Sequence, residues 1–328
     1  MEDFKPGLDG VIATDTSVSY LDVDNEEIVI RGYDLIELAG SKSYPEVAYL
    51  VINGELPNKK QLSDFQKILL DDSTFPDEAY EVLKLTPNTS MVMDIIRTGI
   101  SFLAGFNDES NLMNTSHKSN LNKGIKLMAE VAILTANSYR ILNNQNIIKP
   151  DNSKSFSENF LSMILGHEVS SKEIEIFDKI LICYIEHEMP NSTFAARIIG
   201  STLSDMYGAF VGGISSLKGP LHGGANEAAI HMLLDIQAKG GSKIADKYIM
   251  DKLKNKELIM GFGHRVYMKK SDPRALFLRD YISELESNVE NGKELHEIYK
   301  IVEKVMAREK GLYPNTDYPI ALLFYLLG

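Results

Sequence analysis

Gly219-Pro220-Leu221-His222-Gly223-Gly224-Ala225-Asn226-Glu227 places one histidine between a proline and a pair of glycines, immediately before a predicted amphipathic helix. A second loop, Met260-Gly261-Phe262-Gly263-His264-Arg265, is built in the same way, and a cation follows its histidine. Glycine allows backbone conformations that bring a loop close to a ligand. Two histidines on glycine-rich loops therefore indicate a pair of proton-transfer groups rather than packing residues.

Helical patterns extend outward from these loops over most of the chain. Apolar residues recur at helical spacing over residues 33–39, 46–54, 59–70, 92–103, 123–142, 155–165, 171–187, 194–216, 225–238 and 293–310, and another helix is expected after Pro273. Residues 18–30 alternate instead around an Asp-Asn turn, which predicts a short β-hairpin. The sequence thus predicts a mainly α fold with a small N-terminal hairpin.

The composition excludes several classes of protein. A length of 328 residues fits one large domain and a smaller one. The net charge of -12 argues against nucleic acid and anionic membranes as partners. No apolar run approaches the roughly 18 residues of a membrane span, and the first residues have no signal-peptide pattern. The one cysteine, Cys183, has apolar neighbours, so we expect a core residue and a reducing, cytoplasmic location.

Small residues gather in one predicted helix, residues 204–216, which contains Gly208, Ala209, Gly212 and Gly213. Glycine inside a helix costs about 1 kcal/mol relative to alanine. Close approach of another helix would offset this cost. That helix could belong to the same chain or to a second subunit, and the sequence leaves both interpretations open.

Positive charge is concentrated between residues 252 and 279. This window has eight lysines and arginines against Glu257 and Asp272, so its net charge is +6 in a chain of -12. Charge runs are commonly solvated faces. Because this one surrounds His264, it also fits a binding site for a small anionic ligand.

Two further polar segments contain candidate site residues. His187 is expected to end one helix and Asn191 to cap the next, since asparagine is a favoured N-cap. Asp317 follows a proline turn and precedes an apolar run, where a helix cap is the simplest interpretation. His231 shares a helix with Glu227, but the two-histidine spacing of a zinc peptidase is missing, so no metal site is predicted.

Taken together, these segments resemble the citrate synthase family, including its 2-methylcitrate synthase branch. The matching pieces follow the family order over nearly the full length: Arg31-Gly32-Tyr33-Asp34, His187-Glu188 through Phe194-Ala195-Ala196-Arg197, Gly219 to Glu227, Gly261-Phe262-Gly263-His264-Arg265-Val266-Tyr267, Asp272-Pro273-Arg274 and Tyr313-Pro314-Asn315-Thr316-Asp317. The resemblance implies a large helical domain (1–223), a small helical domain (224–322) and the start of a return segment to the large domain (323–328). It also implies a homodimer, with a helix like that of residues 204–216 between the subunits.

The resemblance implies a reaction as well: condensation of acetyl-CoA or propionyl-CoA with oxaloacetate, then hydrolysis of the thioester to citrate or 2-methylcitrate plus CoA. By position, His222 would hydrogen-bond the thioester carbonyl, Asp317 would remove the α-proton, and His264 would protonate the ketone. Oxaloacetate would bind to His187, Asn191 and Arg274. The CoA would lie along Lys256, Glu257, Leu258, Ile259, Met260, Gly261, Phe262 and Gly263. The CoA thioester is a substrate, so no cofactor is expected.

Elementary chemistry agrees with these roles. The α-carbon of a thioester is a poor acid, so a carboxylate base needs the developing enolate oxygen to be stabilised at the same moment. A neutral histidine just before a helix can do this, because the positive end of the helix dipole favours the neutral ring. Each positioned proton-transfer group contributes roughly 10²- to 10⁴-fold in rate, so alanine at His222, His264 or Asp317 should nearly abolish turnover.

Two departures from the family pattern leave a second hypothesis open. The chain ends at Gly328, whereas family members usually continue into a tail with two further substrate-binding arginines. Asp317 is followed by Tyr318-Pro319-Ile320-Ala321 instead of an aromatic pair and a serine. The alternative is thus a C-terminally truncated, catalytically impaired homologue that only folds and binds a ligand or partner. Acetyl and propionyl groups differ by one methylene, worth about 1 to 3 kcal/mol, so the sequence does not choose between them.

Overall fold

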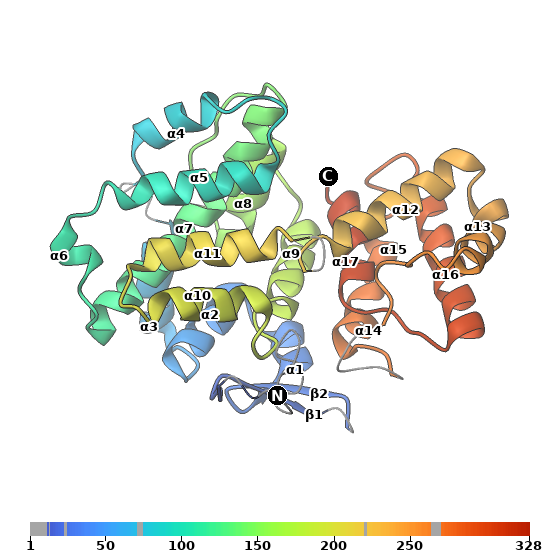
Figure 1. Cartoon of the computed structure of the whole chain (residues 1–328), viewed down its shortest axis with the longest axis horizontal. Coiled ribbons are helices and arrows are strands. Elements are labelled where there is room, and N and C mark those ends of the chain that lie inside the picture. Colours follow the sequence, from blue (N-terminus) through green and yellow to red (C-terminus); the bar gives the residue numbers. More distant parts are fainter. Residues whose placement is uncertain (1–11, 13, 23–24, 71–74, 220–221, 264–269) are drawn as a thin grey trace, which may run out of the picture.

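The structure, a computed structural model, describes residues 12, 14–22, 25–70, 75–219, 222–263 and 270–328, and it is mainly helical as predicted (Figure 1). The elements in chain order are β1 (Ser19–Asp22), β2 (Glu27–Ile30), β3 (Tyr33–Asp34), α1 (Leu35–Ser41), α2 (Tyr44–Asn53), α3 (Lys59–Leu70), α4 (Asp77–Lys84), α5 (Val92–Ala104), α6 (Glu109–Leu112), α7 (His117–Leu142), α8 (Phe156–Leu165), α9 (Ser171–Cys183), α10 (Asn191–Gly200), α11 (Met206–Leu217), α12 (Ala225–Lys239), α13 (Ser242–Lys254), α14 (Pro273–Arg279), α15 (Ile282–Leu285), α16 (Gly292–Lys310) and α17 (Asp317–Leu326).

The predicted N-terminal hairpin is confirmed, and it has a third strand. β1 and β2 pair antiparallel, and β3 adds to β2. The first helix was expected to begin at residue 33, but it begins at Leu35. Tyr33 and Asp34 pair with β2 instead, and the Asp34 carboxylate accepts a hydrogen bond of 2.8 Å from the backbone N–H of Glu37, which caps α1.

The helix predicted over residues 194–216 is two helices, α10 and α11. Leu203 has a φ of 62°, in the left-handed region, and this conformation ends the first helical run. The Asp205 carboxylate then accepts a hydrogen bond of 2.9 Å from the backbone N–H of Gly208 and caps α11. Gly200 at the end of α10 and Asp205 before α11 are usual helix-stop and helix-start signals, but the apolar pattern continues across them.

Two more helix ends differ from the prediction. α9 ends at Cys183, so His187 lies in the following turn instead of ending the helix. Asn191 is the first residue of α10 and not its N-cap, a position that Pro190 takes. The side chain of Asn191 accepts a hydrogen bond of 2.7 Å from the hydroxyl of Ser216 on α11. Its amide oxygen therefore stabilises the contact between two helices.

Several helices of the structure are absent from the sequence prediction, and α13 shows why. Of its 13 residues only Ala245 and Ile249 are buried, so its apolar stripe is very narrow. α17 poses the opposite problem, because nearly all of its residues are apolar and most of them are buried. A helix that is apolar all round has no periodic pattern to detect.

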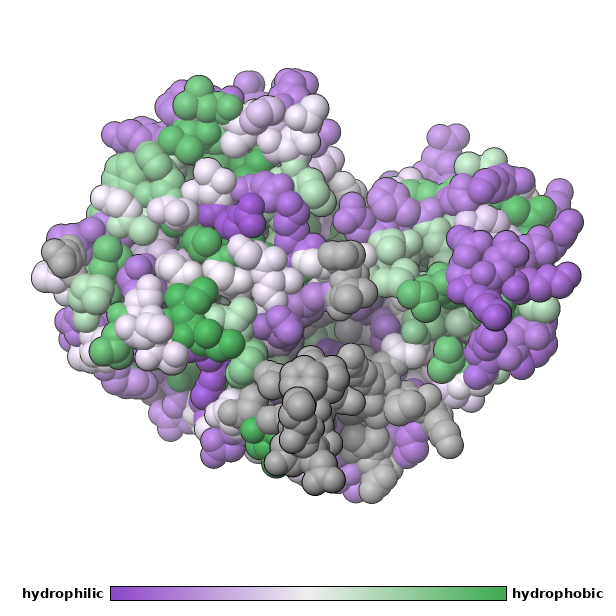
Figure 2. All heavy atoms as spheres, viewed as in Figure 1, coloured by the Kyte–Doolittle hydropathy of each residue, from purple (hydrophilic) through white to green (hydrophobic). Residues whose placement is uncertain are grey.

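The apolar core consists mainly of two clusters. One combines residues of the sheet, α1, α2 and α9 with residues of α12 to α17, and the other combines α4, α5, α7, α8 and α11. Figure 1 shows α12 to α17 gathered in one lobe, and Figure 2 shows a notch between this lobe and the rest. The first cluster contains both Ile180 of α9 and Leu322 of α17, so apolar packing joins the lobes. The domain bounds 1–223, 224–322 and 323–328 stay predictions.

The glycines of α11 allow a close crossing with α10 inside this chain. A Cβ added at Gly212 would lie 2.0 Å from the Cδ1 atom of Ile199, and one added at Gly213 would lie 3.4 Å from the backbone oxygen of Ser192. The small residues of α11 therefore allow close packing against a helix of the same chain. This packing also explains how Ser192, at the beginning of α10, is fixed in place.

Replacing Gly212 by valine should lower the free energy of unfolding by about 1 to 3 kcal/mol, because the branched side chain overpacks the crossing. Urea denaturation measures this change. Gly40→Ala is the matched control, since an added Cβ at Gly40 meets no atom within 4 Å. Equal stability of the two variants would contradict the close crossing.

Candidate active site

His222 lies between α11 and α12 and contacts the beginning of α10. The backbone N–H of Ser192 donates to His222 Nε2 at 3.3 Å, and the Ser192 hydroxyl lies 3.0 Å from the same nitrogen. A backbone N–H can only donate, so Nε2 is an acceptor. A neutral His222 ring therefore carries its proton on Nδ1. This arrangement leaves the imidazole as an N–H donor toward a ligand.

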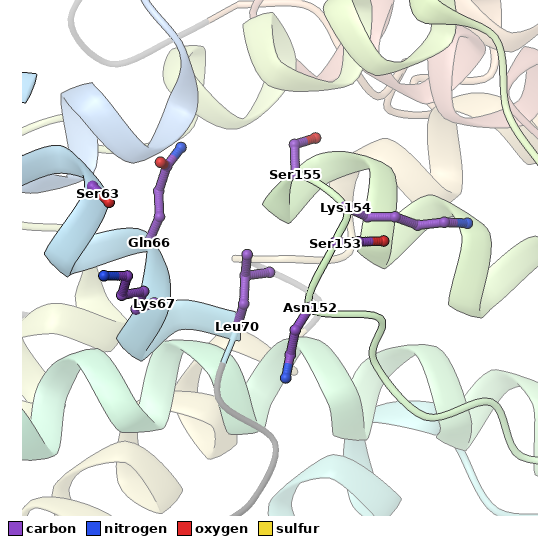
Figure 3. A pocket seen from close by; sticks show the side chains of 8 residues that line it. All are labelled: Ser63, Gln66, Lys67, Leu70, Asn152, Ser153, Lys154 and Ser155. Atoms are coloured by element: carbon purple, nitrogen blue, oxygen red, sulfur yellow. The ribbon is translucent and has the colours of Figure 1, made fainter.

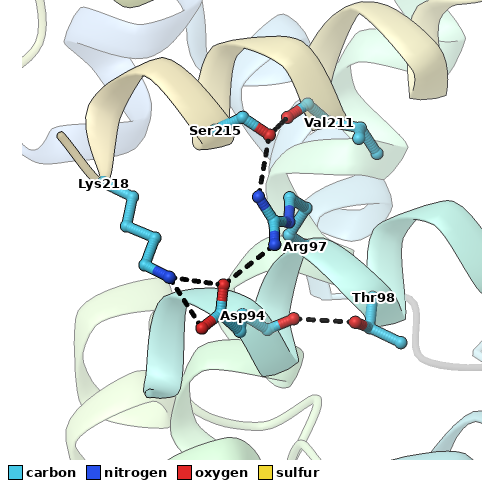
Figure 4. Close-up of polar contacts among 6 residues, drawn as sticks. All are labelled: Asp94, Arg97, Thr98, Val211, Ser215 and Lys218. Atoms are coloured by element: carbon cyan, nitrogen blue, oxygen red, sulfur yellow. Dashed lines mark hydrogen bonds and ion pairs between the residues drawn. The ribbon is translucent and has the colours of Figure 1, made fainter. Parts of the chain in front are cut away.

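A charged cluster fixes the end of α11, from which the His222 loop departs (Figure 4). Lys218, the residue after α11, donates to both carboxylate oxygens of Asp94 on α5 at 2.7 Å. Arg97 donates to the same carboxylate at 2.9 Å and to the Ser215 hydroxyl at 3.3 Å. The hydrogen bond from Lys218 is the main reason why the pKa of Asp94 lies below its ordinary value. The start of the loop is thus tied to a helix of the second core cluster.

Asp317 is the first residue of α17, and its backbone is joined to the segment that precedes His264. The backbone N–H of Asp317 donates to the side-chain oxygen of Asn315 at 3.1 Å. Asn315 in turn donates through its backbone to Gly261 at 3.0 Å and through its side chain to Gly263 at 3.0 Å. The second glycine loop and Asp317 therefore lie side by side. His264 itself lies outside the described residues.

The carboxylate of Asp317 accepts a hydrogen bond of 2.6 Å from the phenol of Tyr184. Tyr184 immediately follows α9, and Asn226 at the beginning of α12 hydrogen-bonds the same phenol. Burial, followed by the negative charge of Asp317, raises the pKa of Tyr184 well above its ordinary value. Tyr184 belongs to none of the sequence motifs. Its position three residues before His187 was the only available signal.

Arg274 and Asp272 form a buried ion pair at the beginning of α14. Arg274 donates to the two carboxylate oxygens at 3.0 and 2.8 Å, and it lies 3.5 Å from the backbone oxygen of Cys183. The side chains are 4% and 0% exposed. Burial alone would raise the pKa of Asp272, but the charge and hydrogen bonds of Arg274, with the nearby His187, outweigh it and lower that pKa. An oxaloacetate carboxylate would have to share this guanidinium with Asp272.

The Asp272 carboxylate should make stability depend on pH. Its pKa is lower in the folded protein than in the unfolded chain, so it stabilises the fold above about pH 4. This contribution is lost as the pH falls through the lowered pKa. The urea concentration at the midpoint of unfolding should therefore fall more steeply for the natural chain than for Asp272→Asn as the pH is lowered from 7 to 3. Asp280→Asn, at a carboxylate that is 82% exposed, should keep the natural pH dependence. Parallel curves for all three proteins would contradict this role of Asp272.

The turn that contains His187 is anchored to the N-terminal sheet. Ser19 of β1 donates to the Glu186 carboxylate at 2.9 Å and accepts from the backbone N–H of Glu188 at 3.1 Å. Glu188 has a φ of 65°, a strained conformation for a residue other than glycine. The sheet thus stabilises the turn that contains His187. In this position the charge of His187 helps to lower the pKa of Asp272.

The predicted CoA segment runs along the small lobe from α13 to the Asp317 region. Glu257 pairs with Lys252 at 2.6 Å, Leu258 is exposed, and Ile259 is buried. Other cations of the +6 window also have acidic partners: Lys270 with Glu26 and Arg279 with Glu303. Glu26 and Glu303 lie outside the window, so these two pairs offset part of its positive charge. The role of residues 256–263 in CoA binding stays a prediction.

We also searched the rest of the described chain for other groups of residues that could form a functional site. A surface hollow of about 570 Å³ lies between α3 and the residues before α8, lined by serine, glutamine, asparagine, lysine and leucine side chains (Figure 3). His231 lies 3.7 Å from Glu227 on an exposed face. Among the described residues there is no group of three or more histidine, cysteine or acidic side chains placed to bind a metal. In that same part of the chain, each helix is too short or too polar to span a bilayer.

Comparison with known proteins gives one consistent result. The sequence profile described as "Citrate synthase, C-terminal domain" matches residues 7–328. The citrate synthase of Heyndrickxia coagulans and the citrate/2-methylcitrate synthase of Bacillus subtilis (strain 168) are each 46% identical over 325 residues, which is 99% of this chain and 86% of theirs. The citrate synthase of Thermoplasma acidophilum, solved as a ternary complex with carboxymethyl coenzyme A and oxaloacetate, superposes with a TM-score of 0.92 at 29% identity, covering 99% of this chain and 85% of that one.

Proposed function

The chain belongs to the citrate synthase family, and from this premise we propose how its residues share the reaction. The enzyme condenses an acyl-CoA with oxaloacetate and hydrolyses the thioester, which gives citrate or 2-methylcitrate plus CoA. The alternative of an impaired homologue gains no support from the comparisons, which span nearly all of this chain.

Asp317 removes a proton from the α-carbon of the thioester, and the electron pair left on carbon forms the enolate. The Nδ1–H group of His222 donates to the enolate oxygen, which stabilises the charge where it develops. The enolate carbon attacks the ketone carbon of oxaloacetate, and His264 gives the ketone oxygen its proton. Water then hydrolyses the thioester and releases CoA. The observation that carries this assignment is the acceptor role of His222 Nε2, because it leaves Nδ1 as the donor.

Oxaloacetate binds beside His187 and Arg274, with Asn191 at the nearby beginning of α10. Support comes from the electrostatic contact of His187 with the Asp272–Arg274 pair. The CoA lies along residues 256–263, which lead to the Gly263 carbonyl that accepts a hydrogen bond from the Asn315 side chain. This route brings the thioester to Asp317. CoA acts as a substrate, and the chemistry needs no cofactor.

Release of free CoA thiol, with and without oxaloacetate, tests the function. We expect release from acetyl-CoA or propionyl-CoA only when oxaloacetate is present. Comparison of kcat/KM for the two thioesters identifies the preferred acyl group, and one methylene allows a preference of about 10- to 200-fold. Absence of oxaloacetate-dependent release from both thioesters would contradict the proposal.

The enzyme assembles as a homodimer through α10 and α11. The structure describes every residue of α10 and α11. In the single chain no residue of α10 is buried, and Tyr207 is the one buried residue of α11. Ile198 and the adjoining Leu203 are 52% and 68% exposed. Figure 2 shows mostly weakly polar and apolar side chains over these helices. Such a surface is typical of a subunit interface.

Sedimentation of the natural chain and of a double variant, Ile198→Asp with Leu203→Asp, tests the assembly. We expect a dimer for the natural chain and a monomer for the variant. A natural chain that sediments as a monomer at micromolar concentration would contradict the proposal. The cytoplasmic location stays a prediction.

A further inference from the structure

The phenol of Tyr184 donates a hydrogen bond to the Asp317 carboxylate, although 133 positions separate the two residues in the chain. At 2.6 Å the bond has the length of a charge-assisted hydrogen bond between a hydroxyl and a carboxylate. Such bonds are about twice as strong as those between neutral groups. The contact also joins the end of α9 to the beginning of α17, and so links the two lobes.

Several elements fix the position of Tyr184 itself. Its backbone N–H donates to the carbonyl of Ile180 at 3.0 Å and so continues the last turn of α9. Its hydroxyl is also hydrogen-bonded by Asn226, from the beginning of α12. Within the part of the chain that the structure describes, the charged groups that face this hydroxyl are Asp317 on α17 and Arg274 on α14. The phenol therefore approaches the carboxylate from a fixed direction.

Tyr184 stays a hydrogen-bond donor over the working pH range. Burial and the charge of Asp317 both oppose loss of its proton. A protonated phenol cannot take up the substrate proton, so Tyr184 is not a second base. Its hydroxyl can only orient the carboxylate and stabilise its ionised form.

We propose that Tyr184 is a positioning residue: by hydrogen-bonding Oδ1 of Asp317, it orients the carboxylate for removal of the α-proton. This inference rests on the proposed function, since it requires Asp317 to be the base. It assigns a task to a residue outside the sequence motifs. A base held in one orientation loses less entropy on reaching the geometry of proton transfer.

Tyr184→Phe removes the hydroxyl and keeps the ring, so it tests the proposal directly. Loss of a hydrogen bond to a charged group should lower kcat about 10- to 100-fold, with a much smaller change in the KM for oxaloacetate. Proton abstraction should become more rate-limiting, so the primary isotope effect with acetyl-CoA deuterated in its methyl group should rise. The acid limb of the kcat/KM profile should move to higher pH, because the ionised carboxylate loses a donor.

Tyr325→Phe is the matched control, since it removes a phenol hydroxyl from the exposed face of the same helix as Asp317. It should leave kcat, the isotope effect and the pH profile unchanged. A Tyr184→Phe variant with natural kcat and pH profile would overturn the proposal. So would one that loses only thermal stability while its isotope effect stays natural. If the natural chain releases no CoA in the presence of oxaloacetate, the proposed function fails as well, which distinguishes the two outcomes.

Discussion

Asp317→Asn should lower kcat by about 10²- to 10⁴-fold, because the amide cannot accept the α-proton of the thioester. Asparagine keeps the size of the side chain and an oxygen that can accept the hydrogen bond of Tyr184. The fold should therefore persist, and the affinity for oxaloacetate should change little. The steady-state rate of CoA release measures kcat, and exchange of the acetyl methyl protons in D2O measures proton abstraction by itself.

Asp280→Asn provides the control, because Asp280 is exposed on the same lobe and has no role in the proposed site. Its kcat should equal that of the natural chain. If Asp317→Asn kept a natural exchange rate, another group would have to be the base. The assignment of both Asp317 and its partner Tyr184 would then be wrong.

His222→Ala should lower kcat by about 10²- to 10³-fold, the usual cost of removing one donor to a developing oxyanion. The loss should be larger in kcat than in the KM for oxaloacetate, because the Nδ1–H group acts on the thioester oxygen. The methyl-proton exchange should slow to the same extent, since enolate formation requires this donor. Steady-state kinetics and exchange together test both statements.

His231→Ala is the matched control for His222→Ala, because His231 is an exposed histidine on α12, the helix that follows the loop. It should turn over at the natural rate. If His222→Ala exchanged the methyl protons at the natural rate but released CoA slowly, His222 would act in a step after enolate formation. That result would contradict its place beside the enolate.

Much of the fold could be predicted because its signals are local. The β-hairpin has alternating residues around a turn, and α3 begins and ends where the pattern predicts. The break around Leu203 was missed, because the apolar pattern continues across the stop and cap signals of Gly200 and Asp205. The early end of α9 was missed for a similar reason, since the apolar pattern continues beyond Cys183.

Sequence motifs allowed the candidate site residues to be predicted, but not the contacts between them. His222 and Asp317 stand beside glycine and proline turns, and the structure brings their segments together through Asn226 and Tyr184. Contacts between distant positions leave no local pattern, so the bond between Tyr184 and Asp317 could not be predicted. The pairing of Asp272 with Arg274 could have been expected, because a capping carboxylate two residues away is within reach of the guanidinium.

Gly261 lies against the first turn of α17, where an added Cβ would come within 2.8 Å of the Cβ of Tyr318. Its φ of 87° also excludes most other residues. With so little clearance, this strand of backbone and the adjoining helix behave mechanically as one rigid part. If CoA binds along residues 256–263 as proposed, a shift of that segment should therefore also shift the first turn of α17. In the proposed site, thioester binding and orientation of the Asp317 carboxylate are then expected to be coupled.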